Sequence, residues 1–286
     1  MEDAIRRFLS YLEHDCQSTN NTIVAYRTDL SQFNHFLRSR RNNPASVADI
    51  DSASLHDYRI WLEGRSYAPS TIARKLASTR SFIDYMGEQG VLECHEAMDI
   101  LQAPSQPRPI PRILKESEIQ ALFVALEAGK SPRDLRDKAI VALLHSTGMR
   151  ASDVVALRVS DLDLNHGTVL RPPERTFGVP LDASAAAIED YLANGRPNLL
   201  RDSKEEACFL NQRGQALTRQ GLWLVVKSWV ETAGIRGEVS PHTFRHTAAH
   251  RWLQAGRPHQ EVQEVLGLSS PNTLRIHLHT NGAHED

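Results

Sequence analysis

The sequence has few cysteines and no long apolar run. Its 286 residues include only three cysteines, Cys16, Cys94 and Cys208, which are far apart and form no CxxC motif or Cys/His cluster. Such usage is typical of the reducing cytosol and predicts neither a structural disulfide nor a metal site. No stretch approaches the ~18 uninterrupted apolar residues of a membrane span, and the first residues do not resemble a secretion signal. We therefore expect a cytoplasmic protein without a membrane role.

The sequence also has no excess of basic residues over acidic ones. The formal net charge is -2 and the pI is about 6.7. Residues 1–103 carry 11 basic and 14 acidic side chains, and the remainder carries 22 and 21. Neither part is a basic domain, so composition alone does not indicate a nucleic-acid partner. Any DNA-binding surface would require basic groups segregated onto one face, and its complex would be sensitive to salt.

The length and one proline-rich stretch predict two domains. A chain of this size exceeds the usual single domain. Four prolines fall within residues 103–112, where they prevent a helix and favour an extended linker. We expect a helical domain at 1–102, a linker at 103–113 and a second domain at 114–286.

The first domain has apolar residues at helical spacing from Ile5 onward, which predicts about four helices. One of them is expected to begin after Pro69, with Ser70 as its N-cap. Its outer face would then carry three basic side chains that we expect to contact DNA, namely Arg74, Lys75 and Arg80.

The second domain is expected to be mostly helical with a small β-sheet. Helical spacing predicts helices at about 116–128, 134–147, 151–158, 183–193, 218–233, 242–255 and 258–266. A β-compatible stretch lies between them at 164–181. Gly234, Gly256 and Gly267 follow three of the helices as natural C-terminal caps.

Two short patterns could bind a phosphate. Arg150 follows the helix-breaking Gly148 and precedes a new helix, where a guanidinium and free amides suit an anion. His242 and Arg245 lie one turn apart on a later helix. By themselves both patterns are weak, because an arginine at a helix junction is more often structural and His-x-x-Arg occurs by chance.

The order of the motifs is far more specific. TGMRASDVVALRVSDLD, SPHTFRHTAAHRWLQAG and VQEVLGLSSPNTLRIHLHT follow one another with a hairpin after the first. This series resembles the tyrosine recombinases, or phage-type integrases. NNTIVAYRTDLSQFNHFL and YAPSTIARKLASTRSFIDYM are similar to the core-binding, SAM-like domain of Xer-type members. The resemblance covers about residues 5–280 and implies a helical core-binding domain followed by an α+β catalytic-type domain.

The resemblance also implies a chemistry. Arg150 and Arg245 match the family's arginines, which bind the scissile phosphate of double-stranded DNA, and His242 matches a histidine that assists proton transfer. In the family a tyrosine attacks phosphorus to give a 3′-phosphotyrosyl link, and a hairpin lysine protonates the leaving 5′ oxygen. No metal or cofactor is implied, because the guanidinium groups stabilise the charge and the protein supplies the nucleophile.

This sequence departs from the family at three catalytic positions. His277 stands where the nucleophilic tyrosine is expected, and no tyrosine follows Tyr191. Leu268 replaces the histidine or tryptophan that follows Leu-Gly in the family. No lysine lies between Lys138 and Lys204, so the hairpin lacks the general acid.

Arginine does not replace the missing lysine well. Arg171 and Arg175 lie on the shortened hairpin, but arginine is a poor proton donor near neutral pH, so we expect phosphate contacts or surface charges. Nine residues follow His277, fewer than the docking helix by which Xer-like relatives contact a neighbouring subunit. We therefore do not expect assembly through such a tail.

Three functions remain open. The first is a DNA-binding protein on a recombinase scaffold that no longer cuts DNA. The second is an active recombinase that uses His277, or one that borrows a tyrosine from an intact recombinase as heteromeric partner. Imidazole can act as a nucleophile, but its nitrogen lies about 2 Å closer to the backbone than a tyrosine oxygen, and about 1 Å of misplacement already costs 10²-fold. The third is an interaction module without a DNA function, which only the acidic balance favours.

Overall fold

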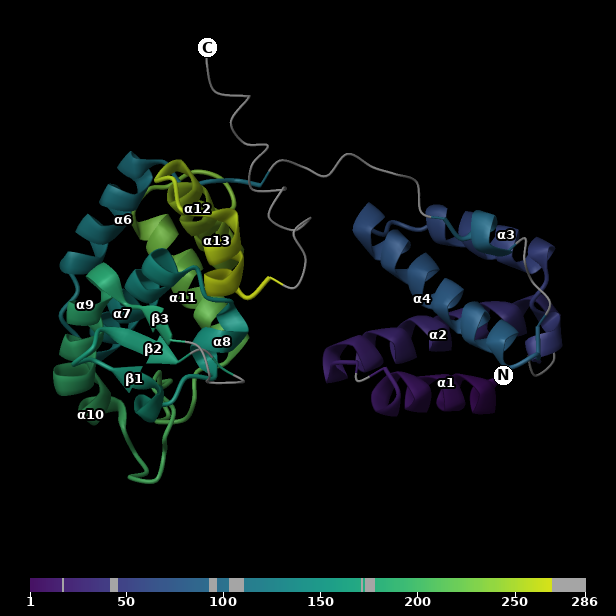
Figure 1. Ribbon diagram of the computed structural model, residues 1–286, viewed down its shortest axis with the longest axis horizontal. Coiled ribbons are helices and arrows are strands. Elements are labelled where there is room, and N and C mark those ends of the chain that lie inside the picture. The colour runs from purple at the N-terminus through teal and green to yellow at the C-terminus, as the bar shows by residue number, and fades with distance from the viewer. Residues whose placement is uncertain are drawn as a thin grey trace, which may run out of the picture. The chain divides into compact units, whose positions relative to one another are not determined.

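The structure is a computed structural model that describes residues 1–16, 18–41, 46–92, 97–102, 111–170, 172 and 178–268. The chain divides into two compact units, Met1–Pro107 and Arg108–Asp286 (Figure 1). Most of the linker expected at 103–113 lies outside the described residues, so its conformation stays a prediction. No described helix has both the length and the apolar character needed to cross a membrane.

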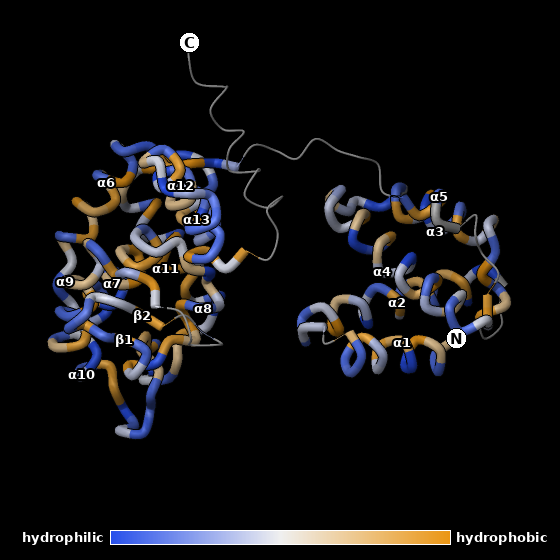
Figure 2. Tube along the Cα trace, viewed as in Figure 1, coloured by the Kyte–Doolittle hydropathy of each residue, from blue (hydrophilic) through white to orange (hydrophobic). Residues whose placement is uncertain are grey.

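The N-terminal unit is built from helices. They are α1 (Glu2–His14), α2 (Asn20–Arg41), α3 (Ser52–Glu63), α4 (Pro69–Glu88) and α5 (Ala97–Ile100), with a 3-10 turn at Val47–Asp49. Apolar and polar residues alternate along them (Figure 2), because one face of each longer helix is buried. Phe8, Leu30, Phe33, Tyr58 and Phe82 are fully buried at the centre of this core.

The expected N-cap of α4 was wrong by two residues. The helix begins at Pro69, and Ala68 is its N-cap. Proline suits the first helical position because its φ angle is already helical and its missing N–H has no partner to lose there. Ser70 is therefore inside the first turn.

The C-terminal unit contains more helices and a small sheet. Its α-helices are α6 (Glu116–Glu127), α7 (Pro132–Thr147), α8 (Ala151–Val155), α9 (Ala185–Asp190), α10 (Arg196–Leu199), α11 (Arg219–Thr232), α12 (Pro241–Gln254) and α13 (His259–Leu266). Most expected boundaries are confirmed to within two residues. The helix expected at 183–193 instead continues through a π-helical turn at Tyr191–Gly195 into α10.

The sheet has three short antiparallel strands in the order β1 (Leu162–Asp163), β2 (Thr168–Leu170) and β3 (Gly178–Pro180). Val169 pairs with Val179, and both side chains are buried against the helices. The predicted fold class, mainly α with a small β-sheet, is confirmed.

Helix α7 is the central element of this unit. It packs against α6, α9, α11 and α12, and most of its residues from Arg136 to Thr147 are buried. A helix surrounded on most sides must be apolar around most of its circumference, as the run Ala139–Leu144 is. Helix α7 ends at Thr147, and Gly148 follows it as the C-cap.

Candidate functional site

The site is organised around the turn at Gly148. This glycine caps α7 in the left-handed region, with φ 59° and ψ 19°. Glycine adopts that conformation without the steric cost that a Cβ atom adds. The turn delivers Arg150 to the N-cap position of α8. The helix, Gly148 break and new helix expected from the sequence are therefore confirmed.

The Arg150 side chain is half exposed, and its guanidinium is bonded to Asp153. Its Nε donates to Oδ2 of Asp153 at 2.9 Å, and the Asp153 side chain is buried while that of Arg150 is 47% exposed. The buried carboxylate fixes one edge of the guanidinium. The Arg150 side chain stands at the N-cap position of α8, beside the turn at Gly148.

Arg245 is in contrast buried, with 6% of its surface exposed. Its Nη1 donates to the Gly148 carbonyl at 2.9 Å, and its Nη2 donates to the Leu266 carbonyl at 2.6 Å. These carbonyls belong to the C-terminal ends of α7 and α13, where the helix dipole is negative. A single guanidinium thus joins two helix ends to α12.

The bond to Gly148 brings Arg245 to the loop that carries Arg150. Two residues span at most about 7 Å of chain, so the two arginines belong to one local site. Convergence of both guanidinium groups on one anion stays a prediction.

His242 and Arg245 lie on α12 as expected, but their environments differ. His242 is exposed, whereas Arg245 is buried. The ring of His246 lies 6.2 Å from that of His242, one helical turn along. Burial, together with His242 and Arg245, lowers the pKa of His246 to about 4, so its imidazole is neutral at physiological pH. His246 was not among the predicted site residues, although its spacing of four from His242 was a signal.

A second missed pair ties α12 to α7. Arg251 Nη1 donates to His145 Nε2 at 2.7 Å, and Arg251 Nη2 donates to the His145 carbonyl at 3.1 Å. Burial and the neighbouring guanidinium lower the pKa of His145 to about 4. The imidazole stays neutral and accepts the bond, which helps to fix the helix that carries Arg245.

Leu268 lies just beyond α13. It is partly buried, packs against the core of the unit, and donates its backbone N–H to the Gln263 carbonyl at 3.0 Å. Its side chain offers no hydrogen bond to a phosphate. Among the other expected site residues, His277, Arg171 and Arg175 lie outside the described residues.

On α4 the expected basic face needs one correction. Arg74 is exposed and Arg80 is partly exposed, but Lys75 is 5% exposed and its Nζ lies 2.9 Å from Oδ1 of Asp29. Lys75 therefore lies on the inner face, because the buried carboxylate of Asp29 requires a partner. The prediction that Lys75 is on the outer face was wrong.

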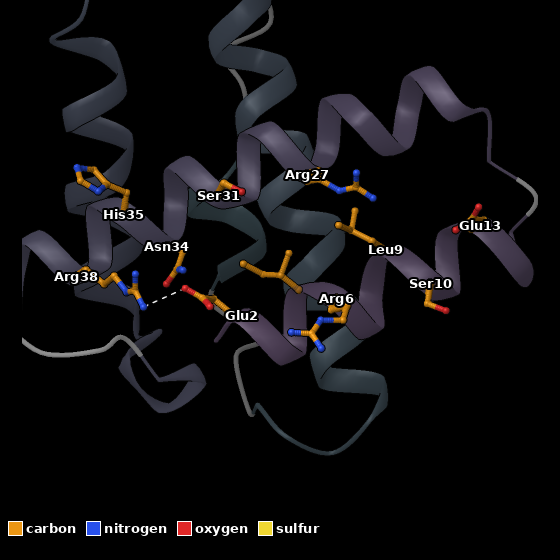
Figure 3. Close-up of a pocket in the computed structure, with 11 residues that line it drawn as sticks. Glu2, Arg6, Leu9, Ser10, Glu13, Arg27, Ser31, Asn34, His35 and Arg38 are labelled. Carbon is orange, nitrogen blue, oxygen red and sulfur yellow. Dashed lines mark ion pairs between the residues drawn. The ribbon is translucent and has the colours of Figure 1, made fainter.

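A shallow hollow of about 600 Å³ lies between α1 and α2. Its rim carries mixed charges, including an ion pair of 3.0 Å between Arg38 and Glu2 (Figure 3). None of the candidate site residues lines it. We therefore assign no ligand to this hollow.

Two family models match the chain. The phage integrase family matches residues 112–284, and the phage integrase N-terminal SAM-like domain matches residues 5–90. The fold is similar to that of XerH site-specific recombinase bound to palindromic difH substrate, with a TM-score of 0.72, 21% identity, and coverage of 95% of this chain and 81% of that one. A lambda integrase dimer bound to a COC′ core site gives a TM-score of 0.70 at 15% identity, covering 100% and 98%.

Curated relatives agree with these matches. Tyrosine recombinase XerC of Roseiflexus sp. strain RS-1 is 38% identical over 288 residues, which cover 99% of this chain and 91% of the relative. Tyrosine recombinase XerD of Listeria innocua is 32% identical, covering 98% and 94%. The chain therefore belongs to the tyrosine recombinases of the phage integrase family.

Proposed function

We propose that this protein binds double-stranded DNA through the recombinase scaffold and is impaired in, or incapable of, strand cleavage. The observation that carries the proposal is a contrast among the positions that the family resemblance assigns. By that resemblance Arg150 and Arg245, around the Gly148 turn, match the family's arginines, whereas His277 matches the position of its tyrosine. Solved relatives that share the fold are bound to DNA, which supports the DNA partner.

The arginine pair provides for phosphate binding. Arg245 is fixed by two carbonyls and so requires no reorganisation when an anion arrives. Arg150 is bonded to the buried carboxylate of Asp153, and 47% of its side chain is exposed. Together with His242 they would grip a scissile phosphate in the same way as in the family.

The hairpin lysine and the tyrosine that the resemblance implies, for protonating the leaving oxygen and forming the covalent bond, have no counterpart in the sequence. No tyrosine follows Tyr191. Tyr191 is fully buried and its hydroxyl is bonded to the Cys208 carbonyl and the Leu210 N–H, each at 3.2 Å, so it cannot reach a phosphate. Loss of a nucleophile costs about 10⁴ to 10⁶ in rate. Loss of a general acid costs about 10² to 10⁴, and the two losses do not simply multiply.

A suicide substrate tests the proposal. Its nick lets the cleaved 5′ end diffuse away, so any covalent intermediate accumulates. We expect the wild-type protein to bind this duplex in a gel-shift assay and to form no adduct on a denaturing gel. An acid-labile, alkali-stable adduct that disappears in His277→Ala would show phosphohistidine chemistry and overturn the inactive assignment.

A sulfur-substituted 5′ leaving group makes the test sharper. Such a group departs without a proton, so the missing lysine no longer matters. His277→Tyr should form little adduct on ordinary DNA and clearly more on the sulfur-substituted substrate. The control is His277→Tyr combined with Arg150→Gln, which should lose that adduct. Equal cleavage with and without Arg150 would contradict the assigned phosphate site.

A partner's tyrosine is tested by the same assay. In one outcome the wild-type chain alone forms no adduct, while the DNA that it binds is cleaved once an intact recombinase that supplies a tyrosine is added. In that case the non-cutting assignment would be wrong for the assembled complex.

A further inference from the structure

A buried carboxylate links α2 to α4. Asp29 of α2 is 0% exposed. Oδ1 of Asp29 lies 2.9 Å from Lys75 Nζ, and Oδ2 accepts a hydrogen bond from Arg74. Ser78 Oγ also donates to Oδ2 at 3.3 Å. One acid is therefore shared by two bases that are adjacent in sequence.

The two bases are not equivalent. The Lys75 side chain is 7% exposed and that of Arg74 is 43% exposed. Lys75 Nζ also lies 5.3 Å from the centre of the Tyr67 ring, and Gln32 Nε2 donates to the Tyr67 hydroxyl at 2.7 Å. The ammonium is thus enclosed by a carboxylate and an aromatic ring. It has no open path to a ligand.

The cluster has one more positive charge than negative charge. A buried carboxylate is costly unless it is paired, and Lys75 supplies the one positive charge that Asp29 needs. Arg74 then adds a second positive charge, so the cluster of Asp29, Lys75 and Arg74 carries a net +1. Because only Arg74 is substantially exposed, that surplus faces solvent at the guanidinium.

We propose that Arg74 is a pre-organised phosphate-binding side chain, and that Asp29 and Lys75 are positioning residues. Asp29 orients the guanidinium, and Lys75 neutralises Asp29 so that the positive charge of Arg74 is not compensated. The proposal rests on the proposed DNA-binding function. Arginine has five N–H donors in a rigid fork, and the bond to Asp29 uses one edge of it. A guanidinium held in place loses less side-chain entropy when it meets a phosphate than a free one does.

The salt dependence of binding by the full chain to a duplex of arbitrary sequence tests this, because phosphate contacts set its slope whatever the sequence. Arg74→Gln should lower the magnitude of the slope of log K against log salt by about 0.9. That change corresponds to about a three- to fourfold smaller loss of affinity between 50 and 200 mM salt.

The buried lysine gives the decisive variant. Lys75→Met should lower the slope about as much as Arg74→Gln, although Lys75 touches no ligand, because Asp29 then cancels the charge of Arg74. Asp29→Asn combined with Lys75→Met should restore the wild-type slope, since the cluster again carries +1. As a control, Arg6→Gln removes an exposed arginine of α1, paired with Asp3 at 3.2 Å, and should leave the slope unchanged.

The outcomes separate the two proposals. Wild-type protein without salt-dependent DNA binding would refute the proposed function. Wild-type binding with an unaltered slope in Arg74→Gln, or a double variant that fails to restore the slope, would refute only the role of this cluster. An equal loss in Arg6→Gln would also refute it, because the effect would be general charge. If Lys75→Met is unfolded by circular dichroism, the double variant and Arg74→Gln still decide the question.

Discussion

Replacement of Gly148 by alanine should be more damaging than its size suggests. The residue has φ +59°, and a Cβ atom there would lie 2.9 Å from Leu266 Cδ2 and 3.0 Å from Ala248 Cβ. The left-handed conformation costs a non-glycine residue about 1–2 kcal/mol. Crowding in a packed core adds about 1–3 kcal/mol. We therefore expect Gly148→Ala to lower the free energy of unfolding of the C-terminal unit by about 2–5 kcal/mol.

Gly256 provides the matched control. It has φ +78° and no atom within 4 Å of the position that a Cβ would take. Gly256→Ala therefore carries the conformational cost alone, about 1–2 kcal/mol. The difference between the two variants measures the contact of the Gly148 turn with α12 and α13.

Urea unfolding followed by tryptophan fluorescence gives these values. A Trp61→Phe background leaves the remaining tryptophans, all beyond residue 200, to report on the C-terminal unit. Because the Gly148 carbonyl accepts a bond from Arg245, Gly148→Ala should also weaken DNA binding, while Gly256→Ala should not. Equal unfolding free energies and equal DNA affinities in the two variants would refute the role assigned to this turn.

Three smaller predictions concern the support of the site. Ser131→Ala removes the N-cap bond that Ser131 Oγ accepts from Asp134 N at 3.2 Å, and should cost about 0.5–2 kcal/mol in urea unfolding. Thr247→Val removes the acceptor of the buried Leu114 N–H, now 3.0 Å away, and should cost about 1–3 kcal/mol, whereas an unchanged midpoint would show that another acceptor takes its place. Burial and a guanidinium lower the pKa of His145 to about 4 in the folded state, so its contribution to stability is present above pH 6.5 and is lost as the pH falls toward 4. Stability measured across that window should depend less on pH in His145→Gln.

The helices were predictable because their signals are local. The expected helix at 242–255 is α12, Pro241–Gln254, and the one at 258–266 is α13. Gly234, Gly256 and Gly267, expected as caps, all have positive φ. Periodicity and capping depend on residues a few positions apart, so a single sequence contains them.

The errors and omissions arise from partners that are distant in the chain. The position of Lys75 on its helix alone predicts an outward side chain, but its partner Asp29 lies 46 residues earlier in the chain. The anchoring of Arg245 depends on carbonyls 97 and 21 residues away, which no pattern of side chains records. Resemblance proposes the positions of the site, whereas the contacts of Arg245 and Lys75 are visible only in the fold.

The two arginines of the site give unequal evidence about function. Arg245 is buried and donates to the carbonyls of Gly148 and Leu266, so its removal would leave two helix ends in the core without that donor. Stability alone is a sufficient reason for its presence. Arg150 is 47% exposed and bonded to Asp153 at the rim, where the fold depends on it less. Under the proposed function, a variant of Arg150 therefore tests phosphate binding with less effect on the fold than a variant of Arg245.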